Sequence, residues 1–175
     1  RSPEYTVVGV FGATGSGKSS LVNALVGADV ARPHVRRPTT SEALSVTWSP
    51  EGATDLLDWL EVRERIVREA PLDPRAGRLI LLDLPDFDSV ETANRAIAVR
   101  LAAQVDALIW VVDPQKYADD VLHAQFITPH ARHGAVTLIV LNQTDLLATG
   151  EVKAVVSSLT GIVERDGIAK ARVLP

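Results

Sequence analysis

The sequence predicts an α/β fold of three layers, in which a mostly parallel central sheet carries helices on both faces. Short apolar runs rich in Val, Ile and Leu alternate along the chain with segments of helical periodicity. Several runs are apolar throughout, which is typical of strands buried on both faces of a parallel sheet. Ligands of such sheets bind beyond the carboxyl ends of the strands, so the residues that follow each strand are the first candidates for function.

The first half of the chain contains two expected strands and two expected helices. Tyr5–Phe11 is apolar and β-branched and predicts a strand, and the apolar spacing after residue 20 predicts a helix that ends at Gly27. Ala28–Ser41 contains prolines and adjacent threonines and is predicted to be irregular. Ala43–Trp48 alternates well enough for a short strand. Apolar residues in Ala53–Gly77 predict an amphipathic helix that prolines close.

The second half alternates more regularly. Arg78–Leu84 and Ala107–Val112 predict buried strands, and Val136–Leu141 and Ala171–Leu174 predict two more. The amphipathic segments between and after these strands predict helices at Val90–Val105, Tyr117–Ile127 and Glu151–Glu164.

Composition favours one soluble globular domain. A chain of 175 residues can bury roughly two-thirds of its unfolded surface, and 46% hydrophobic with 23% charged residues excludes disorder. The net charge of −4 argues against a non-specific nucleic-acid partner. The chain has no cysteine, which excludes disulfides and fits a cytoplasmic location. Its most apolar run, Ala107–Val112, is far shorter than the ~20 residues of a membrane span.

The clearest motif is Gly12–Ser19, which matches G-x-x-x-x-G-K-[ST] between a predicted strand and a predicted helix. Glycines permit positive φ, so successive N–H groups can wrap phosphates, while Lys18 approaches the β- and γ-phosphates and Ser19 is a ligand for Mg²⁺. A chance Gly/Ser turn is the alternative, and the strand and helix around the motif argue against it. The predicted nucleotide-binding residues are Gly12, Ala13, Thr14, Gly15, Ser16, Gly17, Lys18, Ser19 and Ser20.

Asp83 ends the strand that precedes it, at the same edge of the sheet as the phosphate-binding motif. A carboxylate there can hold Mg²⁺ through water, because this ion keeps much of its hydration. The alternative is a solvated turn aspartate before Pro85.

The choice of base is predicted to depend on Asn142, Gln143 and Asp145, which follow the strand Val136–Leu141. Asp145 can accept hydrogen bonds from the adjacent N1–H and N2 amino groups of guanine. Adenine would leave that carboxylate unpaired, so the site would reject ATP. The alternative is an ordinary Asn/Asp turn.

With these motifs the sequence resembles the translation-factor-related class of P-loop GTPases, and within it the Era-like and dynamin-like GTPases of bacterial type. The resemblance covers nearly the whole chain: Gly12–Ser19 is similar to the phosphate loop, Asp83–Asp86 to D-x-P-G, and Asn142–Asp145 to N-K-x-D. It implies a three-layer P-loop NTPase fold, binding of GTP and GDP with Mg²⁺, hydrolysis of GTP to GDP and phosphate, and movement of two switch segments.

The resemblance also places switch I at Arg36–Ser41. Thr40 is then expected to join Mg²⁺ and to sense the γ-phosphate, as a catalytic residue beside Lys18. Arg37 lies three residues earlier and is a candidate internal arginine finger. The alternative for Arg37 is a solvated loop arginine or a contact with lipid phosphate.

Departures from the family pattern weaken the expected hydrolysis. Asp86 stands in place of a glycine and is expected to loosen the coupling of switch II or to repel phosphate. Phe87 stands in place of a water-positioning glutamine, and Gln143 in place of a lysine whose contact with the phosphate loop is expected to be lost. Some relatives are activated by potassium through an Asn or Ser at the fourth position of the phosphate loop. Gly15 stands at that position here, which weakens the hypothesis of potassium activation.

The remaining polar candidates are predicted to be structural. Trp110 is expected in the core and Asp113 in a turn, and the histidines are expected at the surface: His34, His123, His130 and His133.

The leading prediction of function is a slow regulatory GTPase that acts as a conformational switch. One alternative is a guanine-nucleotide-binding assembly switch with little hydrolysis, and another is an ATP-dependent P-loop ATPase or kinase. Residues 1–175 are expected to form a single domain of a longer protein, because the last guanine-binding loop should follow Pro175. The expected partners are guanine nucleotide, a second copy through the nucleotide face, further domains of the same chain, and a protein or a membrane reached through regions outside this sequence.

Overall fold

The computed structural model describes residues 5–31, 43–49, 51–70, 73–88, 92–131, 136–168 and 172–175. Within them the strands form one sheet in the order β3-β2-β4-β1-β5-β6-β7. Only the β2–β4 pairing among them is antiparallel. The strands are β1 (Thr6–Gly12), β2 (Leu44–Thr47), β3 (Glu64–Val67), β4 (Leu79–Asp83), β5 (Ala107–Val112), β6 (Val136–Leu141) and β7 (Arg172–Leu174).

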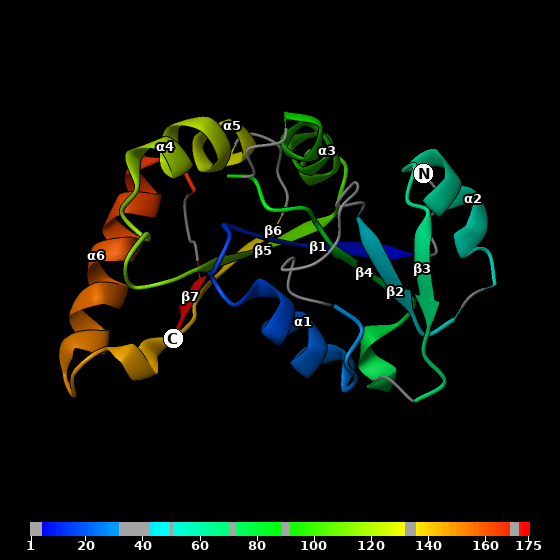
Figure 1. Ribbon diagram of the computed structural model, residues 1–175, viewed down its shortest axis with the longest axis horizontal. Helices are drawn as coiled ribbons and strands as arrows, with labels where there is room; N and C mark the ends of the chain where they lie inside the picture. Colours follow the sequence, from blue (N-terminus) through cyan, green and yellow to red (C-terminus); the bar gives the residue numbers. More distant parts are fainter. Residues whose placement is uncertain are drawn as a thin grey trace.

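Helices cover both faces of this sheet, as the sequence predicts. Figure 1 shows α1 on one side and α3, α4 and α5 on the other. None of the described helices is long and apolar enough to cross a bilayer. The α-helices are α1 (Lys18–Val26), α2 (Ala53–Trp59), α3 (Thr92–Ala102), α4 (Asp120–Leu122), α5 (Thr128–Ala131) and α6 (Glu151–Arg165). Shorter turns are the 3₁₀ helices η2 (Pro74–Ala76) and η4 (Thr144–Leu146) and the π-helix η3 (His123–Ile127).

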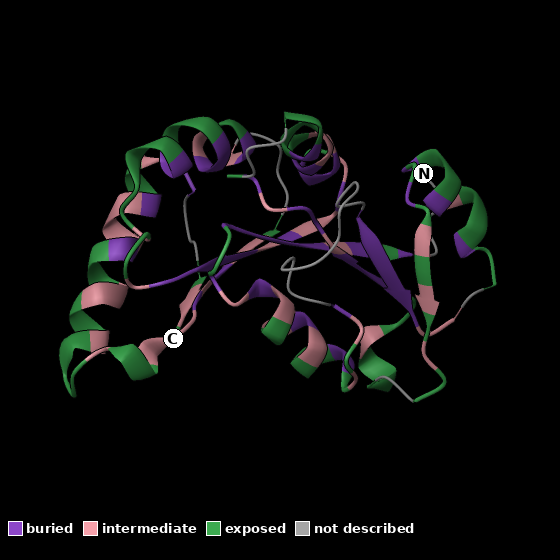
Figure 2. Cartoon of the chain, in the orientation of Figure 1, coloured by how far each residue is buried: buried purple, intermediate pink, exposed green. Residues whose placement is uncertain are grey.

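Two apolar clusters lie on opposite faces of the sheet, and the central strands are largely buried (Figure 2). Neighbouring residues of β1 divide between them: Val10 belongs to the cluster under α1, and Phe11 to the larger cluster under α3 and α6. Trp110 and Val111 of β5 divide in the same way. Since successive side chains of a strand point to opposite faces, this division confirms that the central strands are buried on both sides.

The long helix predicted for Ala53–Gly77 is wrong. Helix α2 ends at Trp59, and β3 then adds to the sheet edge parallel to β2. Glu61 has a φ of 58°, a left-handed conformation that stops the helix and redirects the chain. The exposure of β3 alternates along the strand. Ile66 is partly buried in this edge strand, whereas Leu60 and Val62 are buried in the turn between α2 and β3. The spacing of these residues also suits a helix face.

The helix predicted for Tyr117–Ile127 begins later and runs further. Asp119 caps α4 by accepting from the N–H groups of Val121 and Leu122, and the helical segment continues through the π-turn into α5. It ends at Ala131.

The surface position predicted for the histidines is wrong for both described members. His123 and His130 are 5% and 7% exposed. The ring of His123 contacts the Asp166 carboxylate and lies 2.7 Å from the Tyr117 carbonyl oxygen. His130 packs edge-on against Trp110. His130 Nδ1 lies 2.6 Å from the Phe126 carbonyl oxygen, so both buried rings have hydrogen-bond partners. His34 and His133 lie outside the described residues.

Candidate functional site

The carboxyl ends of β1, β4, β5 and β6 meet at one edge of the sheet. Asp83 pairs with Val10, and Gly12 pairs with Val111, so the phosphate-loop motif starts beside the end of β4. The N–H of Asn142 donates to the Val112 carbonyl at 2.8 Å. The sequence motifs that were predicted separately therefore converge on one edge.

The backbone of the phosphate-loop motif requires its glycines. A Cβ on Gly12 would lie 2.7 Å from Ser16 Oγ and 3.0 Å from the Val111 carbonyl oxygen. Gly15 and Gly17 have φ values of 81° and 84°, which L-residues with side chains adopt at a cost. Gly17 is also the N-cap of α1, so unpaired amides of the first helical turn face the loop.

Lys18 joins the loop to the end of β4. Its side chain is 3% exposed, and its ammonium lies 2.5 Å from Asp83 Oδ1 and 3.6 Å from Asp86 Oδ1. Both carboxylates are also largely buried. One buried cation thus contacts two anions at the place where phosphates were predicted to bind.

Three side chains hold Thr14 at the tip of the loop, and we call Thr14, Asp86, Asp88 and Lys116 the Thr14 clamp. The Thr14 N–H donates to Asp88 Oδ1 at 2.8 Å, and its hydroxyl donates to Asp88 Oδ1 and Asp86 Oδ2 at 2.9 and 3.2 Å. The Lys116 ammonium donates to the Thr14 carbonyl oxygen at 3.1 Å and lies 3.6 Å from Asp88 Oδ2. Asp88 and Lys116 match no motif in the sequence, although both follow strands that end at this edge.

The predicted base-selecting segment is hydrogen-bonded to the same loop. Asn142 Nδ2 donates to the Ser16 carbonyl oxygen at 3.0 Å, and Gln143 Nε2 donates to the Gly15 carbonyl oxygen at 2.8 Å. An ammonium contact with the loop is lost, as expected for glutamine in place of lysine, and the neutral amide of Gln143 contacts the same loop instead. Asp145 lies in η4 with an exposed side chain.

The family follows from the sequence comparison. The profile of the family described as "50S ribosome-binding GTPase" matches residues 7–143, which include all of these motifs up to Gln143. The chain belongs to this GTPase family. A comparison with curated proteins gives no match.

Solved structures share the fold of this GTPase domain. The bacterial selenocysteine-specific elongation factor EF-Sec gives a TM-score of 0.64 at 16% identity, covering 98% of this chain and 25% of its own. Era from Aquifex aeolicus, bound to GDP and AlF₄⁻, gives 0.64 at 18%, covering 98% and 50%. A protein of an oligomerised bacterial dynamin pair gives 0.63 at 16%, covering 97% and 33%. The domain thus spans between a quarter and a half of these three proteins.

The predicted magnesium ligands suit the chemistry of that ion in this GTPase domain. Ser19 is partly buried in the first turn of α1, and Asp83 ends β4 beside Lys18. Across the part of the chain that the structure describes, no group of three or more His, Cys, Asp or Glu side chains could hold a metal. Mg²⁺ needs no such cage, since one or two protein oxygens, phosphates and water suffice. Thr40 and Arg37 lie outside the described residues.

Two of the remaining predictions are confirmed, and Phe87 has a structural role. Trp110 is fully buried, and Asp113 Oδ1 accepts from the N–H groups of Gln115 and Lys116, as in a turn.

Phe87 is 5% exposed and stacks on Phe11 with ring centroids 5.1 Å apart. This packing anchors the segment after β4 to the core of the GTPase domain.

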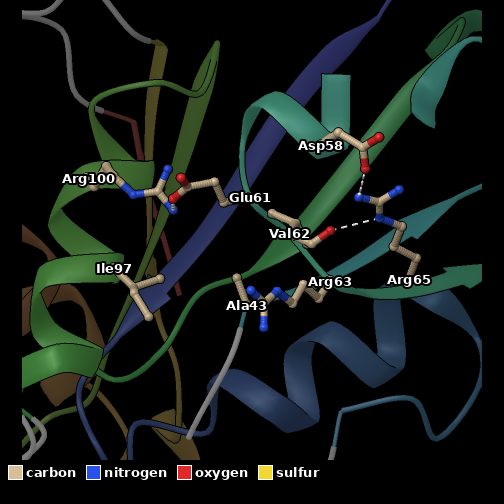
Figure 3. Close-up of a pocket in the computed structure, with 8 residues that line it drawn as sticks. All are labelled: Ala43, Asp58, Glu61, Val62, Arg63, Arg65, Ile97 and Arg100. Atoms are coloured by element: carbon tan, nitrogen blue, oxygen red, sulfur yellow. Dashed lines mark hydrogen bonds and ion pairs between the residues drawn. The ribbon is translucent and has the colours of Figure 1, made fainter. Parts of the chain in front are cut away.

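A hollow of about 530 Å³ lies between α2, β3 and α3 of the GTPase domain. Figure 3 shows Asp58 directed toward Arg65 and Glu61 directed toward Arg100. Arg100 also donates to the Leu60 carbonyl oxygen at 3.1 Å. These guanidinium groups are engaged by neighbouring acceptors and join the α2–β3 segment to α3.

Proposed function

We propose that this domain binds GTP and GDP with Mg²⁺, hydrolyses GTP slowly, and acts as a conformational switch. The observation that carries the proposal is the direct hydrogen bonding of Asn142 and Gln143 to the loop of Gly12–Ser19. A segment suited to guanine is hydrogen-bonded to a segment suited to phosphates. Membership of the GTPase family supports the same assignment.

Each predicted residue then has a role in the proposed site. The loop amides and Lys18 would bind the phosphates, and Asp145 would accept from guanine N1–H and N2. Ser19, Asp83 and Thr40 would hold Mg²⁺, which neutralises charge on the phosphates. Gln143 would cover the base while its amide contacts Gly15.

The slow rate is inferred from the segment after β4. Phe87 cannot polarise water, and its ring is packed into the core, so no glutamine-like group occupies that position. Asp86 contributes a negative charge close to Lys18. Arg37 would then be the source of positive charge during hydrolysis, as an internal arginine finger.

Single-turnover hydrolysis of GTP tests this proposal. Lys18→Ala should reduce the rate and nucleotide affinity by at least about a hundredfold, because the phosphates lose their only buried cation in the loop motif. Lys153→Ala removes an exposed lysine of α6 and is the matched control. Arg37→Ala should lower the rate and leave GDP affinity unchanged. An unchanged rate for Arg37→Ala would contradict the role of Arg37 as an arginine finger. An unchanged rate for Lys18→Ala would contradict the proposed site.

The second candidate function is an assembly switch with little hydrolysis, formed by two copies through their nucleotide faces. One structural neighbour is described as an oligomerised bacterial dynamin pair. A pocket of about 280 Å³ opens beside the Thr14 clamp, with Arg95 and Val121 among its lining residues. Analytical ultracentrifugation with GDP and with a non-hydrolysable GTP analogue tests it. Dimers only with the analogue support this candidate, and monomers in both states contradict it.

A further inference from the structure

We propose that the Thr14 clamp competes with the γ-phosphate, so that the domain prefers GDP to GTP and GTP must open the clamp to bind. The inference rests on the proposed function and adds a means of regulation at the same site. Asp86 and Asp88 lie in the segment that follows β4. Their carboxylates would occupy the groups of Lys18 and Thr14 that otherwise bind phosphate.

The clamp engages the same chemical groups that phosphate oxygens require. The Lys18 ammonium has Asp83 at 2.5 Å and Asp86 at 3.6 Å. The N–H and the hydroxyl of Thr14 both donate to Asp88 Oδ1, at 2.8 and 2.9 Å. Carboxylate and phosphate oxygens accept from the same ammonium and amide donors. A phosphoryl group that approaches these donors must therefore displace Asp86 and Asp88.

Packing and a second ion pair hold the two carboxylates in position. Phe87, which lies between them in sequence, stacks on Phe11 and is 4.6 Å from the Phe126 ring centre. Lys116 lies 3.6 Å from Asp88 and donates to the Thr14 carbonyl oxygen from the opposite side. The clamp is thus fixed at its centre by the core and at its edge by the loop after β5.

The two nucleotides differ in how much they disturb the clamp. GTP carries one phosphoryl group and about one negative charge more than GDP, and this γ-phosphate is one of the two phosphates that the lysine of phosphate-loop proteins reaches. The Asp86 carboxylate is largely buried beside Lys18, where charge pairs interact more strongly than in water, and the more exposed Asp88 carboxylate adds a screened repulsion. GDP has no γ-phosphate, so the two carboxylates can stay in position and most of this repulsion is avoided.

The test is the ratio of two dissociation constants, for a non-hydrolysable GTP analogue and for GDP, measured with Mg²⁺ by calorimetry. Wild type should have a ratio above one. Asp86→Asn and Asp88→Asn keep the shape of each side chain and should each lower the ratio about tenfold, which corresponds to about 1.4 kcal/mol. Thr14→Val, which removes only the hydroxyl contacts, should lower it by a smaller factor.

Asp73→Asn is the matched control, because that carboxylate is exposed and pairs with Arg75 before β4, at the opposite end of the strand from the site. Its ratio should equal that of wild type, and melting temperatures confirm that all variants fold. An unchanged ratio in both clamp variants, with GDP still bound, overturns the clamp alone. Weaker binding of the GTP analogue by Asp86→Asn also overturns it, since Asp86 would then support Mg²⁺. Failure of wild type to bind GDP overturns the proposed function and the clamp together.

Discussion

Gly17 and Gly15 provide a matched pair of substitutions that tests the junction between the phosphate loop and the Asn142 segment. Both glycines have positive φ, at 84° and 81°. A Cβ on Gly17 would lie 2.1 Å from Asn142 Nδ2, whereas a Cβ on Gly15 would have no neighbour within 4 Å. Alanine therefore adds the same backbone cost at both positions and a collision at only one.

The expected magnitudes follow from these contacts. An L-residue in the left-handed region costs about 1–2 kcal/mol, which is the full expected effect of Gly15→Ala on the free energy of unfolding. Gly17→Ala must also displace the Asn142 amide and break its hydrogen bond to Ser16, which adds about 0.5–1.5 kcal/mol. We therefore expect Gly17→Ala to cost about 1.5–3.5 kcal/mol in total.

Urea unfolding followed by circular dichroism measures the stability difference, and GDP binding measures the effect on the site. Gly17→Ala should be the less stable variant and should weaken GDP binding at least about tenfold more than Gly15→Ala, about 1.4 kcal/mol. Equal stability and equal affinity of the two variants would refute the inference that the Asn142 amide is hydrogen-bonded to the phosphate loop.

Three further substitutions probe the scaffold around the site. Asn23→Ala should destabilise the domain by about 2–3 kcal/mol in urea unfolding, because the Asn23 side chain accepts from the N–H groups of Val30 and Ala31. Phe87→Ala should lower the free energy of unfolding by about 3–5 kcal/mol, because it leaves a cavity in the aromatic cluster, and Phe87→Leu should lower it much less. Equal melting temperatures for these two variants would contradict this packing. His123→Ala should lower the melting temperature by more than the exposed substitution Lys153→Ala, because it leaves a buried carbonyl and a carboxylate without their partner.

Much of the site's position could be predicted because the chemistry follows strand ends. Gly12, Asp83 and Asn142 each terminate or follow an apolar run, and parallel strands bring such ends to one edge. Burial of the central strands on both faces could be predicted for the same reason, since their apolar runs show no alternation.

The failures have local physical causes. Leu60, Val62 and Ile66 have the spacing of a helix face, but Leu60 and Val62 lie in the turn before β3 and Ile66 lies in the strand. The positive φ of Glu61, which ends the helix, leaves no signature in the residue type. The spacing of His123 and His130 does not show that their rings meet the Asp166 carboxylate and the Phe126 carbonyl oxygen, so their burial could not be predicted from the sequence.

The Thr14 clamp could not be predicted because it joins side chains from three separate loops. Asp88 and Lys116 are ordinary charged residues of turns in the sequence, and their meeting at Thr14 depends on the order of β1, β4 and β5 in the sheet. Local patterns specify each strand end but carry no information on which loop residues touch.

The central claim is that the edge formed by Gly12–Ser19 and Asn142–Asp145 selects a guanine nucleotide. Calorimetry with Mg²⁺, comparing GDP, a non-hydrolysable GTP analogue and ATP on wild type and Asp145→Ala, tests it most directly. We predict micromolar or tighter binding of guanine nucleotide by wild type, no binding of ATP, and loss of guanine binding in Asp145→Ala. Equal binding of ATP and GDP by wild type would contradict the assignment of Asn142 and Asp145.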